Sequence, residues 1–256
     1  MSIRGPAVAI LRRPLVAAFI ALVVLAAIVE AAVAGGLISP LVVPRPSAVV
    51  LAIGKLWTTE DLPLAFAETL AEAVAATALA AAVAIPAGYL MWRFAALGRA
   101  WRPWLGALFA APTVLLYPLF LVFFGRSHVT IVVMGALTAA IPIALYTLDG
   151  LRAVRPALQN VGKSFNLRGG QMFWKIQFPA AAPTIFSGLR LGLIYGLVNV
   201  IGIEFLIVYG GLGRIVSEMY DNFEFPEMYA GIVFIVIVAF LLFWLLERGE
   251  SAARSL

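Results

Sequence analysis

The stretch "ETLAEAVAATALAAAVAIPAG", residues 68–88, decides the fold of this chain. Apart from two glutamates near its start it is almost wholly apolar. It is also long enough for a helix to cross about 30 Å of hydrocarbon. Its many alanines allow neighbouring helices to approach closely. We therefore predict a membrane helix inside a bundle, with a kink at Pro86, where proline removes a helical hydrogen bond.

This stretch belongs to one of six apolar blocks. The chain has 256 residues, of which 63% are hydrophobic and 12% are charged, more apolar surface than a soluble core of this size can hide. The blocks lack the two-residue alternation of a membrane barrel, so we predict an all-α, polytopic membrane protein that forms a single transmembrane domain over residues 1–256. The six predicted membrane helices are approximately 15–35, 65–91, 104–124, 129–148, 184–208 and 229–247.

The basic residues predict the orientation. Of 18 lysines and arginines, thirteen lie in segments on the same side as both termini, four lie on the other side, and Arg190 lies inside the fifth block. The positive-inside rule then places both termini in the cytoplasm. The first block is long enough to span and lacks a convincing cleavage site, so we expect a retained helix and not a signal peptide. Aromatic residues do not interleave with the bases, so no nucleic-acid partner is expected.

Metal and catalytic chemistry find little support. The chain has no cysteine, and His128 is its one histidine. We expect His128 to be a residue of a short external turn, because no second ligand lies at metal spacing. No arrangement of serine, aspartate and histidine indicates hydrolysis. We therefore predict no metal site and no catalytic residue.

The longest polar segment, residues 150–183, contains "ALQNVGKSFN" at 157–166. Its Gly-Lys-Ser resembles the end of a phosphate-binding loop, but no strand precedes it and alanine occupies the first glycine position, so we predict no nucleotide binding by this chain. We expect instead a helix with Pro156 in its first turn, ended by Asn166 in the left-handed conformation. A second short helix should align Met172, Phe173 and Ile176 before Pro179 stops it.

The spacing within this segment resembles a family signature. Asn160-Val161-Gly162, Asn166 and Ile176-Gln177-Phe178-Pro179 occupy the positions of Glu-Ala-Ala, a glycine four residues on, and an Ile-x-Leu-Pro that begins ten residues later. With "DGLRAVRPAL" before it and "GGLGRIVSEMY" after it, the chain resembles the permease subunits of ABC importers over about residues 40–245. It is most similar to those for nitrate, sulfonate and taurine. Asn160 departs from the pattern because it replaces the family's glutamate.

The resemblance implies a type I ABC importer permease fold in the bacterial inner membrane, with residues 150–183 as a cytoplasmic coupling segment. The implied partners are two ABC ATPase subunits, which bind ATP and magnesium, a second permease copy that is identical or similar, a periplasmic or lipid-anchored solute-binding protein, and membrane lipid. This chain itself would bind no cofactor and would not be an enzyme. Phe165 and Leu167 would be the apolar anchors of the ATPase contact, with Lys163 and Arg168 at its rim. The implied contact residues are Asn160, Val161, Gly162, Lys163, Ser164, Phe165, Asn166, Leu167 and Arg168.

Polar and aromatic residues inside the apolar blocks are candidates for lining a substrate pathway, although packing or a structural hydrogen-bond network would explain them as well. Glu68 and Glu72, near the outer end of the second block, are expected to be solvated. The pathway candidates are Tyr117, Phe120, Tyr146, Tyr195, Asn199 and Glu204.

By resemblance the expected substrate is a small organic or inorganic anion of the sulfonate, taurine or nitrate type. A pyrimidine or flavin precursor is the alternative substrate class. A secondary transporter driven by an ion gradient is the alternative mechanism, but the inverted repeats common in that class are not visible.

Overall fold

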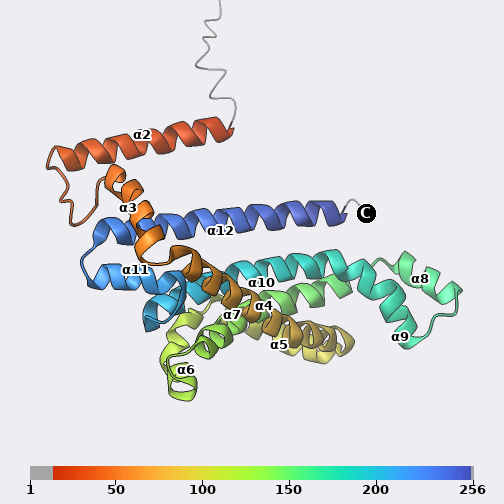
Figure 1. Ribbon diagram of the computed structural model, residues 1–256. Coiled ribbons are helices and arrows are strands. Elements are labelled where there is room, and N and C mark those ends of the chain that lie inside the picture. Colours follow the sequence, from red (N-terminus) through yellow and green to blue (C-terminus); the bar gives the residue numbers. More distant parts are fainter. Residues whose placement is uncertain (1–13, 255–256) are drawn as a thin grey trace, which may run out of the picture.

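The computed structural model describes the backbone of residues 14–254 and the side chains of residues 16–248. Within that part of the chain every element is helical (Figure 1). Arg4, Arg12 and Arg13, which contributed to the predicted orientation, lie outside the described residues. The elements are α2 (Pro14–Ala34), α3 (Pro46–Thr59), α4 (Leu62–Arg93), α5 (Ala95–Ala110), η1 (Thr113–Leu116), α6 (Tyr117–Phe124), α7 (His128–Arg152), α8 (Pro156–Ser164), α9 (Gly169–Met172), η2 (Phe173–Gln177), α10 (Phe178–Ile207), α11 (Gly211–Asp221) and α12 (Phe225–Arg254).

Five helical runs of the described chain are long and apolar enough to cross a membrane, and a bent pair of helices would make a sixth span. The all-α membrane fold is thus confirmed. The third predicted span, 104–124, is not one helix, because the chain turns by 89° between α5 and the η1–α6 segment. Pro112 explains the break: it has no N–H to donate, and it holds Ala111 in an extended conformation with ψ 140°.

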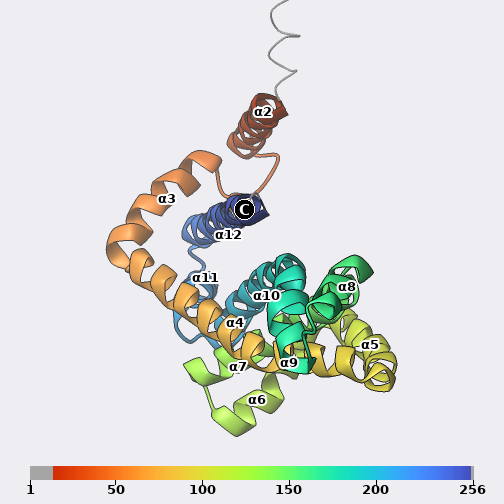
Figure 2. The ribbon, with the colours of Figure 1, turned by 90° about the vertical axis from the view of Figure 1, so that its right-hand side faces the viewer.

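The core of the bundle is formed by α7, which packs against both α4 and α10 (Figure 2). Ala76, Ala80 and Ala84 of the alanine-rich stretch are at most 2% exposed and belong to the main hydrophobic cluster. One face of residues 68–88 is therefore interior, as predicted, whereas Val74, Leu79 and Val83 on the other face are exposed. α4 runs through Pro86 as one helix.

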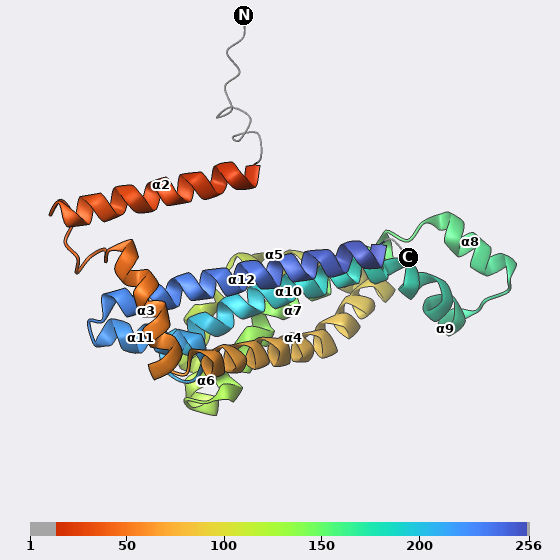
Figure 3. The same ribbon diagram turned by 45° about the horizontal axis from the view of Figure 1, so that its top comes forward.

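The two ends of the bundle carry different extensions (Figure 3). At one end, called the α11 end here, α3, α11 and the start of α12 form a second cluster around Leu56, Leu62 and Ile215. α3 is held to α12 by Lys55, whose Nζ lies 2.8 Å from Oε1 of Glu227. This hydrogen bond raises the pKa of Lys55. At the opposite end, the α8 end, α8 and α9 project beyond the bundle.

α2 lies outside the packed helices, and only 6% of its most apolar 18-residue stretch is buried. It is joined to the rest through α3, where the carboxylate of Glu30 accepts hydrogen bonds from the backbone N–H of Ser47 at 3.0 Å and from its Oγ at 2.8 Å. These bonds satisfy a donor at the start of α3 that has no partner within its helix.

A prediction follows from the α7–α10 contact. A Cβ on Gly192 of α10 would lie 2.7 Å from Cδ1 of Ile143 and 3.0 Å from the backbone oxygen of Ala139. Gly192→Leu should therefore push the helices apart and lower the free energy of unfolding by about 1–3 kcal/mol. Thermal unfolding of the detergent-solubilised chain measures this loss.

The matched control lies on the same helix. Gly202→Leu makes the same change in helix propensity, but no atom lies within 4 Å of a Cβ at that position. Equal melting temperatures for the two variants would contradict the close-packing explanation.

Candidate functional site

The projection at the α8 end begins with α8, residues Pro156–Ser164. Pro156 occupies its first turn, as predicted, where the missing N–H removes no hydrogen bond. Arg155 before it is extended, with ψ 133°, which is the conformation that a following proline favours. The sequence therefore defines the start of this helix locally.

Asn166 ends α8 in the left-handed conformation, with φ 53°, and confirms that prediction. The backbone N–H of Leu167 donates to the oxygen of Gly162 at 3.0 Å, and the N–H of Asn166 donates to that of Lys163 at 2.9 Å. These two bonds form a Schellman motif, which satisfies carbonyls at the end of a helix. The chain thus turns sharply at residue 166 without leaving those carbonyls unpaired.

The segment after this turn, α9 and η2, packs on α8 at a glycine. Gly162 is buried, and a Cβ there would lie 2.6 Å from Sδ of Met172 and 3.3 Å from Cγ1 of Ile176. Met172 and Ile176 thus face α8 together, as predicted, whereas Phe173, predicted on the same side, does not. Phe173 lies against Tyr89 of α4, with ring centroids 4.8 Å apart.

The prediction that Pro179 stops this second helix is wrong. α9 continues through the π-helical turn η2 into α10, with the N–H of Phe178 bonded to the oxygen of Phe173. Pro179 falls in the first turn of α10. The wider turn precedes the proline and takes up the break that we expected Pro179 itself to cause.

The predicted contact residues lie on the tip of this projection. Phe165 is 76% exposed and Val161 is 48% exposed, four residues apart. Of the two anchors predicted from the sequence, Phe165 is exposed and Leu167 is half-buried, while Gly162 is inside. Trp174, at 65% exposure, adds an apolar surface that the sequence reasoning missed. The remaining exposed members are Asn160, Lys163, Ser164, Asn166 and Arg168.

The predicted pathway residues do not form one lining. Tyr195 and Asn199 of α10 face the break in the third span, where Nδ2 of Asn199 donates to Oγ1 of Thr113 at 3.4 Å. Thr113 is in turn 2.9 Å from Oγ1 of Thr138 on α7. The ring of Tyr195 lies 4.8 Å from that of Phe109. Thr113, Thr138 and Asn199 are called the central polar cluster below.

The other pathway candidates lie elsewhere. Tyr117 and Phe120 pack against the main hydrophobic cluster. Tyr146 of α7 packs against Gly188 of α10: a Cβ on Gly188 would lie 2.5 Å from Cβ of Tyr146. Glu204 is fully buried at the α11 end. The central polar cluster thus contains one of the six candidates, Asn199, and two threonines that the sequence did not single out.

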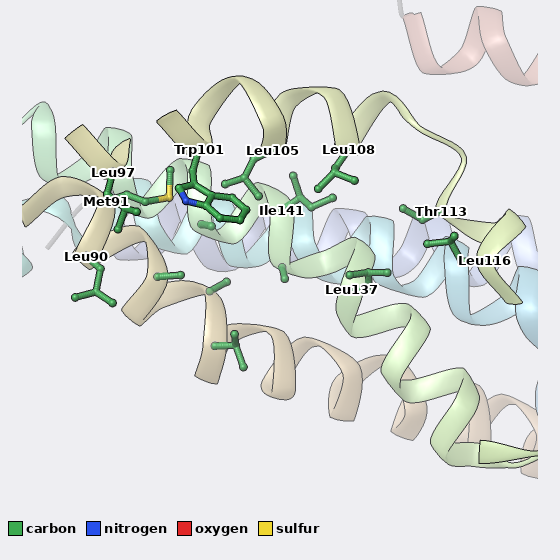
Figure 4. A pocket seen from close by; sticks show the side chains of 15 residues that line it. Leu90, Met91, Leu97, Trp101, Leu105, Leu108, Thr113, Leu116, Leu137 and Ile141 are labelled. Carbon is green, nitrogen blue, oxygen red and sulfur yellow. The ribbon is translucent and has the colours of Figure 1, made fainter. Parts of the chain in front are cut away.

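A cavity of about 440 Å³ lies between α4, α5 and α7 (Figure 4). Its walls are apolar, with Trp101 and Leu105 from α5 and Leu137 and Ile141 from α7. Thr113 lies at its edge, so the cavity adjoins the central polar cluster. Sequence patterns could not have found it, because its leucines read like those that face lipid.

The α11 end contains a polar cluster that corrects two predictions. Glu72, expected to be solvated, is 5% exposed. His128, expected in a turn, is the first residue of α7, and its Nδ1 lies 2.5 Å from Oε1 of Glu72. The burial of Glu72 depends on the corner between α10 and α11, which no local pattern predicts. Among the residues that the structure describes, no three His, Asp or Glu side chains are placed to hold a metal ion.

Residues 77–248 match a protein family described as "Binding-protein-dependent transport system inner membrane component". The chain is 30% identical over 215 residues to the taurine transport system permease protein TauC of Escherichia coli (strain K12), which covers 80% of this chain and 77% of that protein. It is 30% identical over 187 residues to the glycine betaine/proline betaine transport system permease protein ProW of Salmonella typhimurium (strain LT2). That match covers 73% of this chain and 52% of the relative, so the chain spans about half of ProW.

Among solved structures, the fold is similar to a chain of the MetNI methionine ABC transporter in inward-facing conformations. The TM-score is 0.63 at 21% identity, over 72% of this chain and 92% of that chain. The resemblance drawn from residues 160–179 and their flanks is therefore confirmed.

The turn at Asn166 generates a prediction. Asn166→Gly should preserve the Schellman motif, because glycine adopts positive φ freely. Asn166→Val should weaken it by about 1–2 kcal/mol, since a side chain branched at Cβ is strained there. Hydrogen exchange at the backbone N–H of Leu167 measures the difference, with exchange about tenfold faster in the valine variant. Equal exchange in both variants would show that the left-handed turn does not hold this segment together.

Proposed function

Because this chain belongs to the family of binding-protein-dependent transport system inner membrane components, we propose that it is the permease subunit of an ABC importer and couples a substrate pathway to separate ATPase subunits. The match covers residues 77–248, which include the core helices and the α8–α9 projection. The family is one of transport permeases. The substrate, the ATPase contact and the subunit arrangement are the parts that we propose.

The observation that carries the proposal is the projection itself. α8 and α9 extend beyond the bundle (Figure 3). Val161 and Phe165 are exposed at the end of α8, and Trp174 is exposed in the turn η2 that joins the projection to α10. Apolar and aromatic side chains held on a rigid turn are the usual anchors of a protein interface, because their conformational entropy is already reduced. Lys163 and Arg168 lie beside them as rim charges. We propose that this tip enters a cleft on an ATPase subunit, which binds ATP and magnesium.

The proposed orientation places the α8 end in the cytoplasm and the α11 end outside, with both termini inside. Its support is the distribution of basic residues, of which Lys163, Arg168 and Lys175 lie at the α8 end. This arrangement puts the tip where ATP is available. A solute-binding protein would then approach the α11 end.

The pathway is proposed to follow the flank of the bundle. Its centre is filled by Ala76, Ile143 and Val200, each 0% exposed, which leaves no room for a solute there. The central polar cluster and Tyr195 lie on the flank, beside the broken third span, and discontinuous helices commonly form membrane binding sites. A second, identical copy would close the path from the other side.

For the substrate we propose a small organic or inorganic anion of the taurine, sulfonate or nitrate type. The taurine permease relative supports this class. The betaine relative shows that matches of equal identity carry other solutes, and a pyrimidine or flavin precursor stays the alternative. Ligand screening of the cognate solute-binding protein tests the proposal, because that protein selects the solute before the permease meets it.

An ion-gradient-driven secondary transporter is less well supported, because such a protein has no use for the α8–α9 projection. The two mechanisms are separated by purifying the chain with its native partners and measuring ATP hydrolysis with and without substrate-loaded binding protein. Stimulated hydrolysis supports the importer. If no ATPase co-purifies and transport follows an ion gradient, the importer proposal fails.

The contact prediction uses two phenylalanines of almost equal exposure. Phe165→Asp should weaken ATPase-subunit retention by about 2 kcal/mol or more, roughly thirtyfold, and abolish transport, because a charge replaces an apolar anchor. Phe223→Asp is the control: Phe223 is 77% exposed, against 76% for Phe165, but lies between α11 and α12 at the opposite end. Co-purification of the ATPase is the measurement. Equal retention in both variants would contradict the proposed docking.

A further inference from the structure

The corner between α10 and α11 is strained and is held by side chains from two other segments. Val208 has φ 48°, which is unusual for a residue branched at Cβ, and Gly210 and Gly211 have φ 63° and 65°. The first N–H groups of α11 have no partner within their helix. Three of them are bonded instead by side chains of α4 and α10.

These three bonds are short and consecutive. The N–H of Gly211 donates to Oε2 of Glu68 at 2.9 Å, and the N–H of Leu212 donates to Oγ1 of Thr69 at 2.8 Å. The N–H of Gly213 donates to Oε2 of Glu204 at 2.8 Å, and Oγ1 of Thr69 donates to the same oxygen at 3.0 Å. Glu204 thus joins α10, α4 and α11 at one point.

Glu204 is paired with a second buried carboxyl group. Glu204 is 0% exposed and Glu72 is 5% exposed, and their carboxyl groups lie close enough to influence each other's protonation. Each has one buried oxygen, Oε1 of Glu204 and Oε2 of Glu72, that receives no donor from any described residue. Two carboxylates are acceptors only, so a hydrogen bond between them requires a proton on one of the two.

Among the described residues, His128 is the one cationic side chain paired with either carboxyl group. Glu68 adds negative charge, and the guanidinium of Arg126 is bonded to the backbone oxygen of Val208 at 2.8 Å. Arg214 of α11 is paired with Glu218. His128, with Nδ1 2.5 Å from Oε1 of Glu72 and a side chain 54% exposed, faces both the pair and water. The ring of Tyr209 lies 4.9 Å from that of His128.

The start of α11 packs closely on one of these two carboxyl groups. A Cβ on Gly211 would overlap the carboxylate of Glu204. A Cβ on Gly213 would lie 2.6 Å from Cβ of Glu204. The two glycines thus allow the start of α11 to lie directly on the Glu204 side chain.

We propose that Glu72 and Glu204 form a proton-binding site in which one shared proton holds α4, α10 and the start of α11 together, with His128 as its solvent-facing member. The shared proton satisfies both orphaned oxygens without being assigned to either residue. Its loss leaves two buried carboxylates side by side, which repel and loosen the α10–α11 corner. The inference does not depend on the substrate, the orientation or the ATPase partner.

Infrared spectroscopy of the purified full-length chain tests the proton directly. Protonated carboxylic acids have a carbonyl stretch that is separate from the carboxylate bands and shifts on exchange into heavy water. We expect such a band at neutral pH, lost in both Glu72→Gln and Glu204→Gln and retained in the control Glu218→Gln. A wild-type chain without the band, or a band that persists in both glutamine variants of the pair, overturns the proposal.

Stability against pH gives a second readout. An unfolded glutamate releases its proton at about pH 4.3, whereas we propose that the folded pair keeps one shared proton at neutral pH. Wild-type stability should therefore fall as the pH rises from neutral to alkaline and the folded pair loses this proton. The expected fall in melting temperature is about 4 °C or more. Glu204→Gln, whose amide still donates to Glu72 and accepts from Gly213, should match the wild type at neutral pH and lose the pH dependence.

Glu204→Leu separates the shared proton from simple filling of space. Leucine is of similar size but leaves the N–H of Gly213 and the hydroxyl of Thr69 without an acceptor, so it should be less stable at every pH. If Glu204→Gln is as unstable as Glu204→Leu, the carboxylate charge matters and the shared proton does not. Should the leucine variant fail to fold, the glutamine and wild-type pH profiles decide alone, and parallel profiles overturn the proposal.

Discussion

A helix that ends or breaks must find partners for its free backbone N–H and C=O groups, and the rest of this structure depends on how each break meets that constraint. At residue 166 the backbone closes on itself in a Schellman motif. At η2 the bonding widens by one residue and the helix continues. At the start of α11 the first N–H groups have no backbone acceptor, and side chains from α4 and α10 supply the acceptors. Only this last solution ties distant segments together, and it brings two carboxyl groups into the interior.

These different solutions explain which features the sequence could predict. Pro156 and Asn166 act through local conformational rules, so the start and end of α8 were predicted correctly. The alanine-rich stretch was also predicted correctly, because length and composition are sufficient for a membrane helix. The burial of Glu72 and its pairing with His128 were not predicted. Glu72 lies on α4 and His128 on α7, and Glu72 is buried only because α10 and α11 pack over it. The prediction for Pro179 was wrong because the effect of a proline depends on its position in a helix. Inside a helix it breaks the hydrogen bonding, but Pro179 lies in the first turn of α10.

The continuity of the helical run from α9 to α11 gives the molecule a mechanical connection between its two ends. Residues 169–221 form one long candidate span of 53 residues, interrupted by the corner at Val208–Gly210. α10 therefore connects the α8–α9 projection, past the central polar cluster, to the strained corner and the buried pair. The packing of α7 against α4 and α10, through alanines and glycines, restricts bending along the way.

The π-helical turn η2 also sets a direction. An α-helix turns by about 100° per residue, and the wider turn holds one residue more than an α-helical turn would. This extra residue determines the angle, around the axis of α10, at which α9 and α8 leave the bundle. In this chain the direction of the projecting tip therefore depends on the residue count within Phe173–Gln177, together with the packing of Phe173 on the bundle.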